Sequence, residues 1–178
     1  MNDVVRLEAV GFAPYAGASV EVFGLAMNAP TAGLASRRGI VERHLGRPGF
    51  TAVAALEDGE LVGFGYAYAG ASGQWWHDIV AAALGPEMAD RWLSSSFEIV
   101  ELHVRPEAQG AGVGRRLLTT LLTDAPGSTA VLSTGDADSR ARRLYRSMGF
   151  IDLLTHFHFP GRDEPYCVMG RPLPLPPG

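Results

Sequence analysis

The sequence contains no lysine, because all 15 of its basic side chains are arginine. A P-loop uses a lysine to hold nucleotide phosphates, so a Walker-type nucleotide site is excluded. Schiff-base chemistry on a lysine amine is excluded for the same reason.

Cysteine is nearly absent as well, since Cys167 is the single one. One cysteine excludes an internal disulfide framework and a cysteine-based metal site, and we expect no metal. No uninterrupted apolar run approaches the ~20 residues that cross a bilayer. The first ten residues carry two acids and no basic stretch typical of a signal peptide. A net charge of −4 argues against nucleic-acid binding. We therefore expect a cytoplasmic protein with neither membrane nor nucleic acid as partner.

The 178 residues have the length of one domain. We predict a single domain over residues 1–172 and a proline-rich tail over 173–178. Apolar patterning predicts the order β-α-α-β-β-(helical insert)-β-α-β-α-β-β, an α+β fold with a mixed sheet of about seven strands flanked by helices. Strands are predicted at 4–10, 50–56, 61–69, 97–104, 128–134, 150–159 and 165–173. Helices are predicted at 13–28, 32–45, 75–84, about 86–93 and about 112–123, and from the Asp caps at 136–138 onward, with Ala141, Leu144, Tyr145 and Met148 on one face.

Three alternating glycines stand before the predicted helix at 112–123, in the stretch "VRPEAQGAGVGRRLL" (104–118). A helix N-terminus presents unpaired N–H groups, and glycines let an anion approach them closely. This pattern favours a phosphate or pyrophosphate held by backbone, with Arg115 and Arg116 adding positive charge. A Rossmann fingerprint would need G-x-G-x-x-G, and this stretch is G-x-G-x-G.

The same stretch resembles the acetyl-CoA pyrophosphate loop of the GNAT acetyltransferase superfamily, through Gln109, Gly112 and Gly114. A second segment, "DADSRARRLYRSMGF", resembles the family's Asn-x-x-Ala-x-x-Leu-Tyr-x-x-x-Gly-Phe pattern. Asp138 departs from it by standing where asparagine is usual, which puts that side chain's contact with the cofactor in doubt. The order of predicted elements fits the GNAT fold over nearly the whole chain.

The resemblance implies transfer of an acetyl group from acetyl-CoA to a primary amine, directly in a ternary complex. It implies that the strand at 97–104 parts from the strand at 128–134, and that the Val104 N–H polarises the thioester carbonyl. The residues that it assigns to the cofactor are Leu102, His103, Val104, Gln109, Gly110, Ala111, Gly112, Val113, Gly114, Arg115, Asp138, Arg142 and Tyr145.

Tyr145 is the best candidate for the acid that protonates the leaving thiolate, although a core tyrosine would occupy the same position. Glu98 and Glu101 are the candidate bases that deprotonate the acceptor amine. Strand alternation puts them on opposite faces, and Glu101 is favoured because it lies closer to the acetyl group. His103 and His77 are weaker alternatives.

The acceptor is the open question. The resemblance makes residues 24–38 and 70–96 walls of the acceptor site, with Trp75, Trp76 and His77 as substrate contacts. Packing of these aromatic residues onto the sheet is the alternative. Arg37 and Arg38 either bind an acceptor carboxylate or face water.

The first expectation is a bacterial N-acetyltransferase acting on a small-molecule amine. The alternatives are a protein N-terminal or lysine acetyltransferase, and a non-catalytic acyl-CoA-binding or sensor module. A homodimer is expected from the resemblance alone.

Overall fold

The computed structural model describes residues 3–174, which form two compact units. Unit 1 comprises residues 3–68 and 99–123, and unit 2 comprises residues 69–98 and 124–174. Seven strands follow the hydrogen-bonding order β1-β2-β3-β4-β5-β7-β6, which confirms the predicted mixed sheet. The single domain predicted for residues 1–172 stays a prediction.

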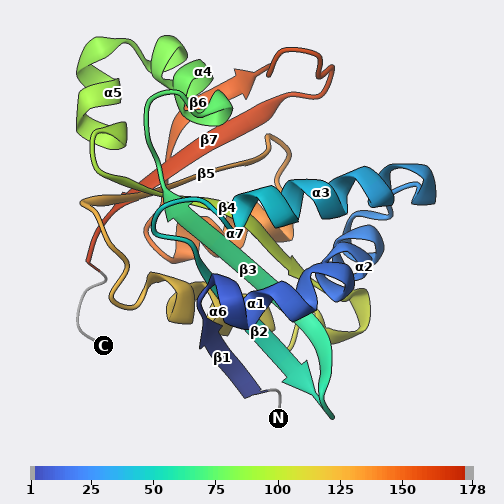
Figure 1. The fold of residues 1–178 in the computed structure, drawn as a ribbon. Helices are drawn as coiled ribbons and strands as arrows, with labels where there is room; N and C mark the ends of the chain where they lie inside the picture. The colour runs from blue at the N-terminus through green and yellow to red at the C-terminus, as the bar shows by residue number, and fades with distance from the viewer. Residues whose placement is uncertain (1–2, 175–178) are drawn as a thin grey trace. The chain divides into compact units, whose positions relative to one another are not determined.

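Unit 1 contains strands and helices from both of its chain segments (Figure 1). The strands are β1 (Asp3–Leu7), β2 (Thr51–Glu57), β3 (Glu60–Ala69, its last residue in unit 2) and β4 (Ser96–Val104, unit 1 from Ile99 onward). The helices are α1 (Ala9–Phe12), α2 (Ala16–Met27), α3 (Leu34–His44) and α6 (Val113–Leu122), with the 3₁₀ turns η1 (Ala13–Tyr15), η2 (Thr31–Gly33) and η3 (Pro106–Ala108). Strands β1, β2 and β3 pair antiparallel.

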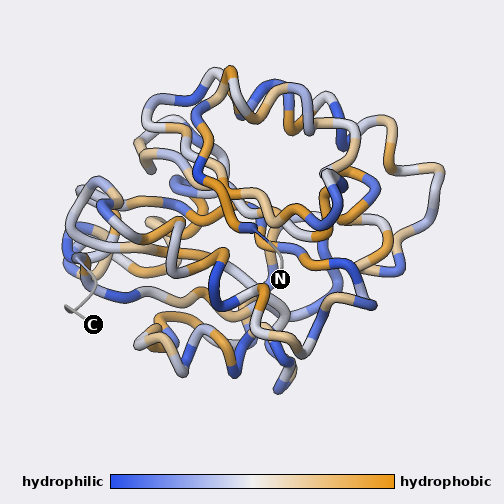
Figure 2. Tube along the Cα trace, turned by 90° about the horizontal axis from the view of Figure 1, so that it is seen from below, coloured by the Kyte–Doolittle hydropathy of each residue, from blue (hydrophilic) through white to orange (hydrophobic). Residues whose placement is uncertain are grey.

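Side chains alternate between the two faces of β3, and helices of unit 1 pack against both faces. Phe64 and Tyr66 pack with buried residues of α1, α2 and α3 in one core cluster. The intervening Gly63 points the other way, since a side chain there would meet Leu117 of α6. Along the trace, hydrophobic and hydrophilic residues alternate within helices (Figure 2), as expected for helices with one buried side. In α6 the buried residues are Val113, Leu117, Leu118, Leu121 and Leu122.

Unit 2 has its own core, built from the helical insert and three strands (Figure 1). Its elements are α4 (Trp75–Leu84), α5 (Pro86–Leu93), β5 (Thr129–Gly135), α7 (Arg140–Ser147), β6 (Ile151–Phe157) and β7 (Tyr166–Pro172). Strand β7 pairs antiparallel with both β5 and β6. The parallel pairing of β4 with β5 covers Ser96–Glu98 against Thr129–Val131. The core cluster comprises Val80, Trp92, Leu93, Val131, Phe159 and Val168.

An ion network, buried at Arg142 and Asp136 and partly exposed at Asp152 and Arg146, ties α7 to the strands of unit 2. The Arg142 guanidinium donates to Asp136 (Nη1 to Oδ1, 2.7 Å) and to Asp152 (Nη2 to Oδ2, 3.0 Å). Arg146 and the Cys167 thiol also donate to Asp152, at 2.7 and 3.2 Å. Burial alone would raise the pKa of Asp152, but these hydrogen bonds outweigh burial and lower it from 3.8 to about 2.

One helical run, Ala9–Met27, is long and apolar enough to cross a membrane by length and composition, with a mean hydropathy of 1.3. Core helices pass the same test. Phe12, Ala16, Val20 and Val22 of this run are buried in the core of unit 1, so the core itself accounts for their apolar character.

Three predictions, of a strand end, a helix cap and a buried position, need correction. The strand predicted at 4–10 ends at Leu7 because α1 begins at Ala9; short apolar alternation does not distinguish a strand from a first helical turn. Ser139, and neither Asp136 nor Asp138, caps α7 by accepting the Arg142 N–H at 3.1 Å. Arg142 is buried where the helical face was expected to bury Ala141, because two aspartates compensate its charge.

The ion network predicts a measurable dependence of stability on Asp152. A folded-state pKa below the unfolded value stabilises the protein above about pH 4, and this stabilisation is lost as the pH falls toward 2. Asp152→Asn is therefore expected to lower the free energy of unfolding at pH 7 by about 1 kcal/mol in urea titrations, less than the full pKa shift implies, because solvent screens the partly exposed carboxylate.

The same substitution should flatten the dependence of stability on pH between about 4 and 2. Asp163→Asn is the matched control, because Asp163 is an exposed aspartate that makes no salt bridge within residues 3–174, whereas Asp152 pairs with Arg142 and Arg146. Equal stability of the two variants at pH 7 would show that the network contributes nothing.

Candidate active site

The glycine stretch forms a turn directly before α6. Gly110 and Gly112 have φ of +84° and +78°, the left-handed region that favours glycine, and Gly112 is the N-cap of α6. The Gln109 side chain donates to the Val104 carbonyl at 3.0 Å, and Arg116 Nη1 donates to the Ala111 carbonyl at 3.2 Å. The loop is therefore braced by its own side chains.

The backbone of this loop fits an anion. Within residues 3–174, no group accepts a hydrogen bond from the N–H of residues 110–114, and the first helical bond runs from Arg116 N to Gly112 O. A Cβ at Gly110 would meet nothing within 4 Å, so the space beside the loop is open. Free N–H groups at the positive end of a ten-residue helix suit a pyrophosphate. The predicted cofactor residues from Gln109 to Arg115 thus lie together in unit 1.

Strand β4 leads into this loop and alternates its side chains between two faces. Side chains added at Gly63 and Gly65 would meet Val104 Cγ2 and Leu102 Cδ1, on the face that α6 covers. Glu101 and His103 occupy the opposite face, where they bond each other. Glu101 and His103 therefore share one face of β4.

Glu101 is held from two sides. Arg37 of α3 donates through Nη2 to Oε1, and His103 Nε2 lies 2.5 Å from Oε2. The guanidinium carbon of Arg37 stacks 3.3 Å from the ring centroid of Phe23, which in turn meets His103 edge-on at 5.1 Å. Arg37, one of two arginines expected to bind an acceptor carboxylate or face water, instead pairs with this internal carboxylate. Arg38 pairs with Glu42 on the helix surface.

A second histidine, His44 at the end of α3, lies near this group. His44 Nδ1 is 3.0 Å from the Tyr66 hydroxyl. Burial of the imidazole lowers the pKa of His44 below 6.5, and the positive charges of Arg47, Arg43 and Arg37 act in the same direction, while Glu101 opposes them. His44 is therefore neutral at pH 7 and does not compete with Arg37 for Glu101.

The two carboxylates predicted as alternative bases fall in different units. Glu98 belongs to unit 2, is buried, and lies where β4 pairs with Val131 of β5. Glu101 belongs to unit 1, beside Arg37 and His103.

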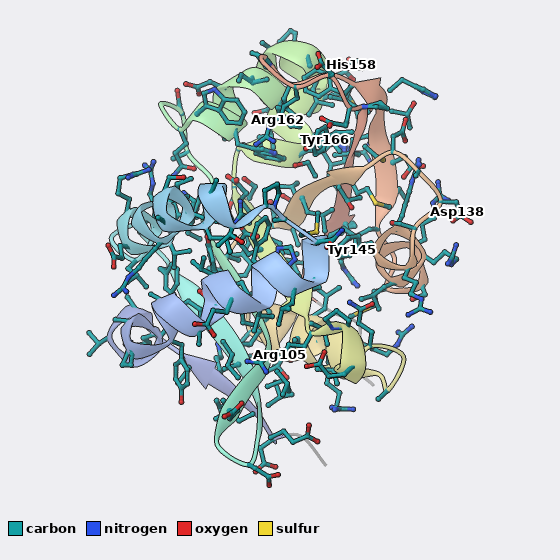
Figure 3. The ribbon with its side chains drawn as sticks, turned by 90° about the vertical axis from the view of Figure 1, so that its right-hand side faces the viewer. Arg105, Asp138, Tyr145, His158, Arg162 and Tyr166 are labelled. Atoms are coloured by element: carbon teal, nitrogen blue, oxygen red, sulfur yellow. The ribbon has the colours of Figure 1, made fainter. Side chains whose placement is uncertain are left out.

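Tyr145, Asp138 and Arg142 all belong to unit 2, and Figure 3 labels Tyr145 and Asp138 there. Tyr145 is buried on α7, with its ring 5.7 Å from that of Phe150. Asp138 is exposed and bonds Arg143 at 2.8 Å, and the charged Nη atoms of Arg142 are occupied by the ion network. Contacts of these three residues with a cofactor stay predictions.

The two tryptophans that open α4 have different environments. Trp75 is 59% exposed and stacks on Phe159 at 5.6 Å, whereas Trp76 packs against the unit 2 core and donates from Nε1 to Ser133 Oγ at 3.0 Å. His77 lies 3.3 Å from Asp78. Trp75 is thus the aromatic side chain open to a ligand. The sequence gives no signal that Phe159 contacts Trp75, because the two residues lie far apart along the chain.

Comparison with known proteins identifies the family. Residues 26–150 match the model of the acetyltransferase (GNAT) family. The GCN5-like protein acetyltransferase Rv2170 of Mycobacterium tuberculosis is 40% identical over 130 residues, which are 68% of this chain and 63% of that protein. The N-alpha-acetyltransferase RimI of the same organism is 43% identical over 54 residues, 30% of this chain and 34% of that protein. The chain therefore spans less than two thirds of the length of either relative.

A solved structure shows the same fold. The structure of yncA from Salmonella typhimurium, determined with its cofactor acetyl-CoA, has a TM-score of 0.65. The match covers 100% of this chain and 97% of yncA at 18% identity.

The left-handed glycines of the loop predict a stability effect that arises from backbone strain and not from a clash. Gly110→Ala and Gly112→Ala are each expected to lower the free energy of unfolding by about 1–2 kcal/mol, because a Cβ is disfavoured at positive φ. Neither position has an atom closer than 3.7 Å to an added Cβ.

Gly33→Ala is the control, since its surroundings are equally open and its φ is −92°. Thermal unfolding of the three variants measures the difference. Full stability of Gly110→Ala and Gly112→Ala would contradict the loop conformation.

Proposed function

The chain belongs to the acetyltransferase (GNAT) family, and from this premise we propose that it transfers the acetyl group of acetyl-CoA to an amine of a protein. The proposal rests above all on the loop before α6, whose unbonded N–H groups include those of the two left-handed glycines, Gly110 and Gly112. Bound acetyl-CoA would supply the acetyl group as an activated thioester.

The backbone of the loop would hold the pyrophosphate of acetyl-CoA. The N–H groups of residues 110–114 lie at the N-terminal end of α6, and none of them donates a hydrogen bond within residues 3–174. Arg115 is exposed beside them and adds positive charge. The Val104 N–H keeps its predicted role of polarising the thioester carbonyl, and Tyr145 keeps that of general acid.

The acceptor amine must lose a proton before it attacks. Glu101 and His103 form the titratable pair that the structure places on the strand leading into the loop. This pair supports amine chemistry, because a proton acceptor is held in fixed orientation by a bonded partner.

The relatives favour a protein as acceptor over the small molecule that the sequence alone put first. Both mycobacterial relatives are named for acetylation of proteins or of α-amino groups. A small-molecule amine remains the second candidate, because exposed Trp75 stacked on Phe159 offers an aromatic surface for a compact cation.

The cofactor assignment predicts selective stabilisation. Acetyl-CoA and CoA at about 100 times their dissociation constant should add about 2.7 kcal/mol, which raises the unfolding midpoint by about 5–10 °C; NAD and ATP should not. Ala111→Glu should abolish this shift by placing negative charge in the loop, and the matched Ala111→Gln should retain it. A full shift with Ala111→Glu would place the cofactor elsewhere.

The acceptor assignment predicts which amines release CoA. Peptides with a free N-terminus should give faster thiol release than small-molecule amines at equal concentration. The thiol readout is clean because Cys167 is buried, and burial together with Asp152 raises its pKa to about 12. The chain itself has no lysine that could become acetylated.

Mass spectrometry of the product peptide then locates the acetyl group on its α-amine or on a lysine. Faster release with small amines would reverse the order of the two candidates. Acetyl-CoA binding without turnover of any amine would instead indicate a non-catalytic acyl-CoA-binding module.

A further inference from the structure

We propose that His103 Nδ1 is the atom that takes the proton from the acceptor amine, and that Glu101 and Arg37 are positioning residues for His103. This inference rests on the proposed function. It places His103, which the sequence alone makes a weaker alternative, ahead of Glu101 as the base.

The first step concerns the hydrogen-bond partners that the Glu101 carboxylate already has. One of its oxygens accepts from Arg37 Nη2, and the other lies 2.5 Å from His103 Nε2. The Glu101 side chain is only 10% exposed. An acceptor amine reaching Glu101 directly would have to displace Arg37 or His103.

The second step is the tautomer of His103. An ionised carboxylate only accepts hydrogen bonds, so the bond between Glu101 and His103 requires a proton on Nε2. The neutral ring then carries its lone pair on Nδ1. Nδ1 has no hydrogen-bond partner within residues 3–174 and is not among the polar atoms sealed from solvent there. It is therefore the open proton acceptor of this group.

The third step is the rigidity of the ring. Phe23 of α2 meets the His103 ring edge-on at 5.1 Å, and Phe64 of β3 lies 5.7 Å away. Arg37 stacks on the same Phe23 ring while it bonds Glu101. Two aromatic rings and one carboxylate thus fix the imidazole, and Arg37 fixes both the carboxylate and one of the rings. Fixed orientation is what a proton transfer requires.

The position of His103 along the chain agrees with this role. It directly precedes Val104 and the loop that carries the free N–H groups. In the step itself, one N–H bond of the acceptor ammonium breaks and its electron pair stays on the amine nitrogen. The proton forms a new bond to Nδ1. Glu101 then stabilises the resulting imidazolium through the existing Nε2–H bond.

The test combines a spectrum and a kinetic comparison. Long-range ¹H–¹⁵N NMR of histidine-labelled protein, at a pH where the ring is neutral, distinguishes the two tautomers. His103 is expected to be protonated on Nε2, with its signal assigned by its loss in His103→Gln. In Glu101→Gln a neutral amide replaces the carboxylate and bonds either tautomer, so a mixture is expected. Protonation on Nδ1 in the unmodified protein would overturn the proposal.

The kinetic arm uses His103→Gln, which keeps an N–H donor for Glu101 but offers no base. Its kcat should fall by about 100-fold or more with little change in the acceptor KM. His158→Gln is the matched control, because His158 is an exposed histidine of unit 2. Arg37→Gln should lower kcat less than His103→Gln does. An unchanged acetyl-CoA thermal shift shows that each variant is folded. A kcat within about fivefold of the unmodified protein in His103→Gln would overturn the assignment.

Failure of the proposed function would look different. The unmodified protein would then turn over no amine. The NMR spectrum needs no substrate, so it would still show whether His103 is protonated on Nε2, as its bond to Glu101 requires.

Discussion

The alternation of side chains along β4 is the constraint on which the candidate site depends. Leu102 and Val104 face α6, so their neighbours Glu101 and His103 must face α2 and α3. A shift of one residue in this strand would bury the carboxylate among the leucines of α6 and expose Val104 to Arg37. The close approach of Gly63 and Gly65 to β4 leaves no space for side chains there, which favours a single register. The apolar packing of unit 1 thus also orders the polar group.

The sequence predicts well those features that local patterns encode. The helices of the insert have the residues predicted for them, 75–84 and 86–93. Helix α6 begins at Val113, one residue after its predicted start. Both depend on short-range signals, such as Pro86 at the start of α5 and the glycines before Val113. The β4 alternation is equally local, so the pairing of Glu101 with His103 could have been proposed from their spacing.

Features that depend on distant partners were not predictable. Arg37 lies 64 residues before Glu101, and nothing in its own helix distinguishes it from Arg38, which pairs with Glu42 on the surface. Arg142 is the same case in unit 2. An arginine on a predicted helix face is expected in water, yet Asp136, directly after β5, and Asp152 of β6 both pair with it. Burial of a charge follows from its compensation, and compensation is a property of tertiary structure.

Arginine, and not lysine, at position 37 has a chemical consequence for an enzyme of this family. A lysine there could also pair with Glu101, but its amine would be a nucleophile of the kind that acetyltransferases modify. The planar guanidinium of Arg37 stacks on Phe23 while its donors bond the carboxylate. A point-like ammonium would make one of these contacts at a time. In the proposed reaction, Arg37 therefore supplies a positive charge that is inert toward acyl transfer, and the acceptor amine is the nucleophile.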